Sequence, residues 1–171
     1  MQAIQRVLLR VTKWSAWVGM LALIGAMVTT CADVIARKFF GHTYPGTIDV
    51  VQLLVLAAAY LAIPYTFMRR GHVAVAVVAE ILSGRALEFL NVLSALLAAL
   101  LMGGFTWFGY HHALMQAEYG DVSQTIAIPM VWYWVPLVYG CALSMATALW
   151  LAVEALTGFL APHVFPSGGH R

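Results

Sequence analysis

The chain has 171 residues, of which 63% are hydrophobic and only 9% are charged. A soluble domain of average composition carries about 25% charged residues, so this composition excludes an ordinary soluble domain and indicates a membrane protein. The formal net charge is +2, and the few basic residues are too scattered to bind nucleic acid. We therefore expect membrane lipids and membrane proteins as partners, and no nucleic acid.

Four apolar stretches are long enough to cross a bilayer, since about 20 helical residues cover about 30 Å of hydrocarbon. We predict an all-α membrane protein with a single four-helix domain over residues 14–160, a cytoplasmic N-terminus at 1–13 and a cytoplasmic tail at 161–171. The first stretch is too long for a cleaved signal sequence and lacks an A-x-A-like site, so we expect an uncleaved span. The expected spans are residues 14–36, 48–68, 86–110 and 126–155.

The basic residues predict the orientation of these spans. If both termini lie in the cytoplasm, Arg37 and Lys38 are the only external basic residues. The positive-inside rule therefore favours N-in/C-in, with external segments at 37–47 and 111–125. The basic residues that lie inside are Arg6, Arg10, Lys13, Arg69, Arg70, Arg85 and Arg171.

The segment RRGHVAVAVVAEILSGR, residues 69–85, lies between the second and third spans. Its apolar part is too short to cross a bilayer, and helical periodicity gathers Arg69, His72 and Glu80 on one stripe opposite a wide apolar face. We predict a short amphipathic helix at about 72–83 in the cytoplasmic interface, with Gly71 permitting the turn and Arg69 near lipid headgroups. It is either a stiff connector or a surface that packs against a partner.

Few ionisable residues lie in the spans, where they are costly. Asp33 and Arg37 have the i,i+4 spacing that favours an ion pair, and Asp49 lies in the first turn of the second helix, where a carboxylate complements the helix dipole. We expect Arg37 to bridge both acids and pin the first hairpin, with Thr47 as the N-cap. No carboxylate falls at mid-depth, which argues against a self-sufficient ion-coupled carrier.

Prolines and small residues predict details of helix shape and packing. Pro136 and Pro64 are expected to bend their helices, whereas Pro129 suits the start of the fourth helix. Two faces of small residues predict close helix packing, either within the chain or with a partner. These faces are Ala95, Ala99 and Gly103 in the third span and Ser144, Ala148 and Ala152 in the fourth.

A haem-binding or other redox anchor subunit is the alternative function. Haem requires two histidines at matched depth on facing helices, and no histidine lies within an expected span. No catalytic or metal motif occurs, so we expect no enzyme activity and no cofactor. Cys31 and Cys141 are interpreted as packing residues. An orphan four-helix protein with a structural role is a third possibility.

Three segments in order resemble one family of transport proteins. They are DVIARKFFGHTYPGTIDVVQLLV (33–55), RRGHVAVAVVAEIL (69–82) and SQTIAIPMVWYWVPLVYG (123–140). These segments resemble the small, DctQ-like membrane subunit of tripartite ATP-independent periplasmic (TRAP) transporters. Two positions differ from the family pattern: the family commonly has Glu at Asp49, and often has Asp at Ala76.

The resemblance implies a non-catalytic small permease subunit in the bacterial inner membrane. Its partners would be a large multi-span permease subunit, which carries sodium and an organic acid of the C4-dicarboxylate or sialic acid class, and a periplasmic substrate-binding protein. Sodium coupling would belong to the large subunit. The candidates for structural or partner contacts are Asp33, Arg37, Asp49, Arg69, Gly71, His72, Pro129 and Pro136.

Overall fold

The computed structural model describes residues 2–41, 45–69 and 85–160. They form four long helices: α1 (Gln2–Phe40), α2 (Thr47–Met68), α4 (Arg85–Tyr119) and α5 (Val131–Leu160). Each is long and apolar enough to cross a membrane. The predicted all-α fold with four membrane spans is therefore confirmed. The helix predicted over 72–83 and the tail 161–171 lie outside the described residues.

The helices differ in length from the predicted spans. α1 begins at Gln2 rather than at residue 14, because hydropathy marks where the apolar stretch begins and not where helical backbone begins. α4 continues to Tyr119, and it ends at Gly120, whose φ of 67° lies in the left-handed region that glycine adopts without strain. α5 begins at Val131, five residues later than the predicted span.

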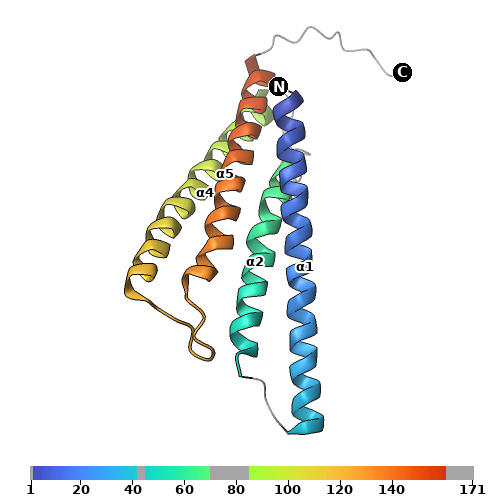
Figure 1. The fold of residues 1–171 in the computed structure, drawn as a ribbon. Helices are drawn as coiled ribbons and strands as arrows, with labels where there is room; N and C mark the ends of the chain where they lie inside the picture. The colour runs from blue at the N-terminus through green and yellow to red at the C-terminus, as the bar shows by residue number, and fades with distance from the viewer. Residues whose placement is uncertain (1, 42–44, 70–84, 161–171) are drawn as a thin grey trace, which may run out of the picture.

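The four helices lie side by side in one layer, in the order α1, α2, α5, α4 (Figure 1). α1 packs on α2, α2 on α5, and α5 on α4, whereas α1 touches α5 at only a few residues. Among the described residues, no Cα atom of α4 comes within 8 Å of α1 or α2. The α1–α2 and α4–α5 hairpins are thus joined through the contact between α2 and α5.

The layer has two ends, which we name by what lies there (Figure 1). The terminal end holds the start of α1 and the end of α5, together with the end of α2 and the start of α4. The loop end holds the end of α1, the start of α2 and residues 120–130, which connect α4 to α5.

Small residues allow the helices to approach closely. A Cβ added to Gly19 of α1 would lie 3.0 Å from the carbonyl oxygen of Ala58, and one added to Gly140 of α5 would lie 2.3 Å from that of Tyr60. The Ser15 hydroxyl donates to the carbonyl of Leu61 at 3.0 Å and so links α1 to α2. Backbones this close gain dispersion contacts, which drive helix association in lipid.

The two small-residue faces of the sequence also pack inside the chain. Ala99 of α4 and Ala148 of α5 belong to one buried cluster with Phe67 of α2, and Gly103 lies against Met145. Ser144 is also buried. The residues of these faces that the cluster includes therefore pack inside the chain, where α2, α4 and α5 meet.

Large apolar side chains remain exposed on all four helices. Of the described residues, only eight apolar ones are buried, and six of them are alanines. An exposed apolar surface of this extent requires lipid or another protein to cover it. Examples on the two outer helices, with exposures between 53% and 72%, are Trp14, Trp17, Leu21, Met27, Leu97, Leu100 and Phe105.

Candidate functional site

Six of the eight predicted contact residues are described, and they lie at both ends of the layer. Gly71 and His72 lie outside the described residues. Asp33, Arg37, Asp49 and Pro129 lie at or near the loop end, and Pro136 follows in the second turn of α5. Arg69 alone lies at the terminal end, directly after α2.

Asp33 connects the end of α1 to the start of α2. Its carboxylate forms an ion pair with Arg37 one turn later, with 2.5 Å between Oδ2 and Nη2, and accepts a hydrogen bond from the Thr47 hydroxyl at 3.3 Å. The Asp33 side chain is 7% exposed and that of Arg37 is 62% exposed. The acid is therefore held in the interior while the guanidinium extends from the surface.

The prediction that Thr47 is the N-cap of α2 is wrong. Thr47 is the first residue of the helix, and the cap position belongs to Gly46, which has a φ of 91° and no side chain to make a cap hydrogen bond. The Gly46 carbonyl instead accepts the hydrogen bond of the Val50 N–H at 3.0 Å. The left-handed turn at Gly46 brings Thr47 to Asp33, so its hydroxyl serves the hairpin rather than the helix end.

Asp49 is the centre of a hydrogen-bond network between α2 and the 120–130 connection. It is 4% exposed, and its Oδ2 accepts hydrogen bonds from the Ser123 hydroxyl at 2.6 Å and from the N–H groups of Thr125 and Ile126 at 3.1 Å. The Thr125 hydroxyl donates to Oδ1 at 3.3 Å. The predicted bridge from Arg37 to Asp49 is absent from the described residues, because this connection supplies the donors instead.

The 120–130 connection is itself closed into a tight turn. Val122 and Pro129 form an antiparallel bridge, and Ser123 exchanges two hydrogen bonds with Ile128: its N–H donates to the carbonyl at 2.8 Å, and its hydroxyl accepts from the N–H at 3.0 Å. Ala127 has a φ of 55°, an uncommon backbone conformation for a residue with a Cβ. The turn therefore presents its donors to Asp49 in a fixed arrangement.

Two further contacts hold this turn on α2. The Tyr133 hydroxyl donates to the backbone carbonyl of Asp49 at 2.9 Å. Ile126 packs over Gly46 so closely that an added Cβ there would lie 2.3 Å from its Cγ2 atom. Asp49 is thus a structural carboxylate that fixes the α4–α5 hairpin on the α1–α2 hairpin at the loop end.

The prolines occupy different positions relative to α5. Pro129 precedes the helix rather than beginning it, and its carbonyl accepts the N–H of Trp132 at 3.1 Å. Pro136 lies inside α5, close enough to its start that few helical hydrogen bonds are lost. Pro64 lies inside α2 and is buried.

The histidines that the structure describes do not face one another across helices. His111 and His112 lie on α4, not in a loop as predicted. His111 lies edge-on to Trp107 with ring centroids 4.8 Å apart, and His112 stacks on Trp134 at 5.6 Å. Trp134 also donates its indole N–H to Gln116. These rings join the end of α4 to the start of α5, and neighbours on one helix do not provide the paired ligands that haem requires.

Basic residues gather at the terminal end. Arg69 donates from Nε to the Tyr65 hydroxyl at 3.1 Å and lies over the same ring at 5.6 Å. Arg6, Arg10 and Lys13 occupy exposed positions in the first part of α1. The only salt bridge among the described residues is the one between Arg37 and Asp33, so these four cations have no acidic partner there.

Comparison with known proteins places this arrangement in a family. The family model described as "Tripartite ATP-independent periplasmic transporters, DctQ component" matches residues 26–158. That match covers more than three quarters of the chain. It includes the part of α1 from residue 26 onward, all of α2 and α4, and nearly all of α5. No curated protein matches the chain. The chain therefore belongs to the DctQ family, the small membrane component of TRAP transporters.

Proposed function

We propose that this chain is a non-catalytic scaffold in the inner membrane, which supports the large, sodium-coupled subunit of a transporter for an organic acid. The family indicates a small permease subunit of a tripartite system. The observation that carries the proposal is the open layer of four helices, whose exposed apolar surface extends over all four helices. Such a layer offers a long side on which a larger membrane protein can pack.

The charges of the described residues fit a supporting role better than a carrier role. Alternating-access carriers bind substrate and ions near the middle of the bilayer. Here Asp33, Asp49, Glu118 and Asp121 lie toward the loop end and Glu154 toward the terminal end. Asp33 and Asp49 are also engaged in hydrogen bonds that hold the fold together. We infer that substrate and sodium bind to the large subunit and that this chain needs no cofactor.

The distribution of basic residues supports an orientation with both termini in the cytoplasm. Arg6, Arg10, Lys13 and Arg69 lie at the terminal end, and cytoplasmic segments are enriched in such residues. In this orientation the loop end faces the periplasm, where a substrate-binding protein would approach. Arg37 and the 120–130 connection would lie on that side.

The substrate class is proposed from the family resemblance. Organic acids, such as C4-dicarboxylates or sialic acids, carry carboxylates whose recognition would fall to the binding protein and the large subunit. Substituting exposed residues of this chain should therefore alter the yield of the complex rather than its choice of substrate.

Reconstitution into liposomes tests whether the large subunit carries the substrate and this chain only supports it. The large subunit, this chain, or both would be incorporated, and uptake of a radiolabelled organic acid would be measured with the binding protein outside and an inward sodium gradient. We expect uptake only when both membrane subunits are present. Uptake driven by this chain alone, or full uptake by a large subunit that is equally stable without it, would contradict the scaffold role.

A further inference from the structure

A groove runs between α1 and α5 in the half of the layer nearer the terminal end. Because both helices pack on α2 but barely on each other, they leave a furrow with α2 as its floor. Its volume is about 450 Å³, which lies within the roughly 300–1,000 Å³ of small-molecule sites. It is lined mainly by Arg10, Val11, Trp14 and Val18 of α1, Leu61 of α2 and Tyr139 of α5.

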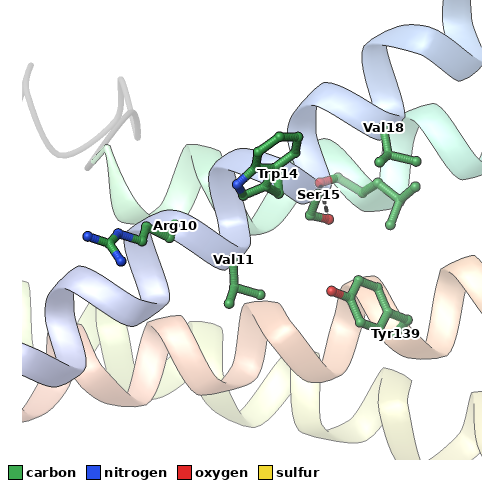
Figure 2. Close-up of a pocket in the computed structure, with 7 residues that line it drawn as sticks. Arg10, Val11, Trp14, Ser15, Val18 and Tyr139 are labelled. Carbon is green, nitrogen blue, oxygen red and sulfur yellow. Dashed lines mark hydrogen bonds between the residues drawn. The ribbon is translucent and has the colours of Figure 1, made fainter.

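The groove is apolar along its length and cationic at one end. Figure 2 shows Val11 between Arg10 and Val18 along α1, with Arg10 at one end of the group and Val18 toward the other, and Tyr139 on the neighbouring α5. Arg10 has no hydrogen-bond or acidic partner among the described residues, where the only salt bridge joins Arg37 to Asp33. A ligand that fits this site has a hydrocarbon body and an anionic end.

The groove lies along α1 at the depth where a lipid headgroup meets its acyl chains. Lys13 and Arg37 flank the apolar part of α1 and are about 36 Å apart at 1.5 Å per residue, slightly more than the roughly 30 Å of hydrocarbon. Arg10 therefore lies at headgroup level at the terminal end. Val18 lies about 12 Å deeper along the helix, among the acyl chains. The exposed indole of Trp14, between them, suits the interface.

We propose that this groove holds one anionic phospholipid, with its phosphate on Arg10 and one acyl chain along Val11, Val18, Leu61 and Tyr139. Charge complementarity favours this occupant, because Arg6 and Lys13 lie four and three residues from Arg10, about one helical turn, and α1 has no acidic residue before Asp33. A transmembrane helix of a partner does not fit as well. It is about 10–12 Å wide and offers an anion to Arg10 only if its sequence has an acid there, whereas an anionic phospholipid always places its charge at headgroup level.

Native mass spectrometry of the full chain in mild detergent tests this site. The protein, alone or in the complex in which it purifies, would be titrated with phosphatidylglycerol and with phosphatidylcholine of the same acyl chains. We expect one phosphatidylglycerol to be retained about fivefold more strongly than phosphatidylcholine, the preference that a single basic residue provides near an anionic headgroup. Equal retention of the two lipids, or retention of neither, would overturn the proposal.

Two variants with matched controls distinguish binding of the lipid headgroup from binding of the acyl chain. Arg10→Gln should remove the fivefold preference, whereas Lys38→Gln, which removes a cation at the opposite end of α1, should keep it. Val18→Trp should fill the groove and abolish retention of both lipids. Met20 is equally exposed but lies about 200° around α1 from Val18, so Met20→Trp should leave the retention of both lipids unchanged. Arg10 is exposed, so its substitution leaves the fold intact, and an unchanged preference in that variant would refute the proposal.

A photo-crosslinking residue at position 18 identifies the occupant in native membranes. Crosslinks to phospholipid support the assignment. A crosslink to another protein would mean that the groove is an interface with a partner chain, and would overturn it.

Discussion

Replacing Gly140 with alanine perturbs the contact that holds the two hairpins together. α2 and α5 form the main contact between the hairpins, and the Gly140 backbone lies directly against Tyr60. An added Cβ would lie 2.3 Å from the Tyr60 carbonyl oxygen and 2.9 Å from the Tyr60 Cβ. The first obstacle is a backbone atom, so no change of side-chain rotamer relieves the clash.

The size of the effect follows from this geometry. Carbon-to-carbonyl contacts between helices normally measure about 3.3–3.6 Å, so α2 and α5 must separate by roughly 1 Å. Overpacking a tight interior costs about 1–3 kcal/mol, whereas the better helix propensity of alanine returns up to about 1 kcal/mol. We expect a net loss of about 1–2 kcal/mol in the free energy of unfolding.

The assay must report separation of the hairpins, because membrane helices keep their helicity in many detergents. Cys31 is exposed on α1, whereas Cys141 is buried. A fluorescence donor on Cys31 and a fluorescence acceptor on a cysteine introduced at Leu100 of α4 would therefore report the distance across the layer by energy transfer. Increasing the SDS fraction of mixed micelles then gives an unfolding midpoint. Gly140→Ala should lower that midpoint.

Gly104→Ala is the matched control, because a Cβ at Gly104 of α4 meets nothing within 4 Å. That variant should be as stable as the parent or slightly more stable. If the two glycine substitutions shift the midpoint equally, the close packing of α2 on α5 is not what joins the hairpins.

Three further perturbations address other contacts. Asp49→Ala should make the 120–130 connection more susceptible to limited proteolysis. Asp49→Asn can keep an acceptor toward Ser123, so its cleavage should stay close to that of the parent. Equal cleavage of both variants would contradict the role of the Asp49 hydrogen bonds in holding this connection. Arg37→Ala should lower the yield of the complex without changing which acid is taken up, and a changed selectivity at full yield would contradict this. Ala148→Leu should separate α4 from α5 and cost about 1–3 kcal/mol, measured by the same SDS titration, whereas Ala142→Leu at an exposed position should cost little.

The features that the sequence predicted correctly are local. Apolar runs of sufficient length identified four spans, because the thickness of the bilayer sets the length of a helix that crosses it. The ion pair of Asp33 and Arg37 follows from their spacing on one helix. The burial of Ala99 and Ala148 follows from small residues at helical spacing, although only the structure shows that the two faces pack on one another.

The features that the sequence did not reveal depend on residues far apart in the chain. Asp49 is 74 residues from Ser123, and no periodicity relates a carboxylate to hydroxyl and amide donors in a distant turn. The order of the helices was also hidden, since these helices carry apolar residues on nearly every side and no single face is marked as inward. The end of α4 was misplaced because hydropathy falls before Tyr119, whereas the helix continues until Gly120 turns the chain.

Whether this chain supports a larger carrier subunit can be measured by native mass spectrometry of the tagged protein, extracted gently from its own membranes. We expect a one-to-one complex with a much larger multi-span protein and no added mass of a haem. A chain that is recovered alone under conditions that preserve other membrane complexes, or one that carries a redox cofactor, would contradict this supporting role.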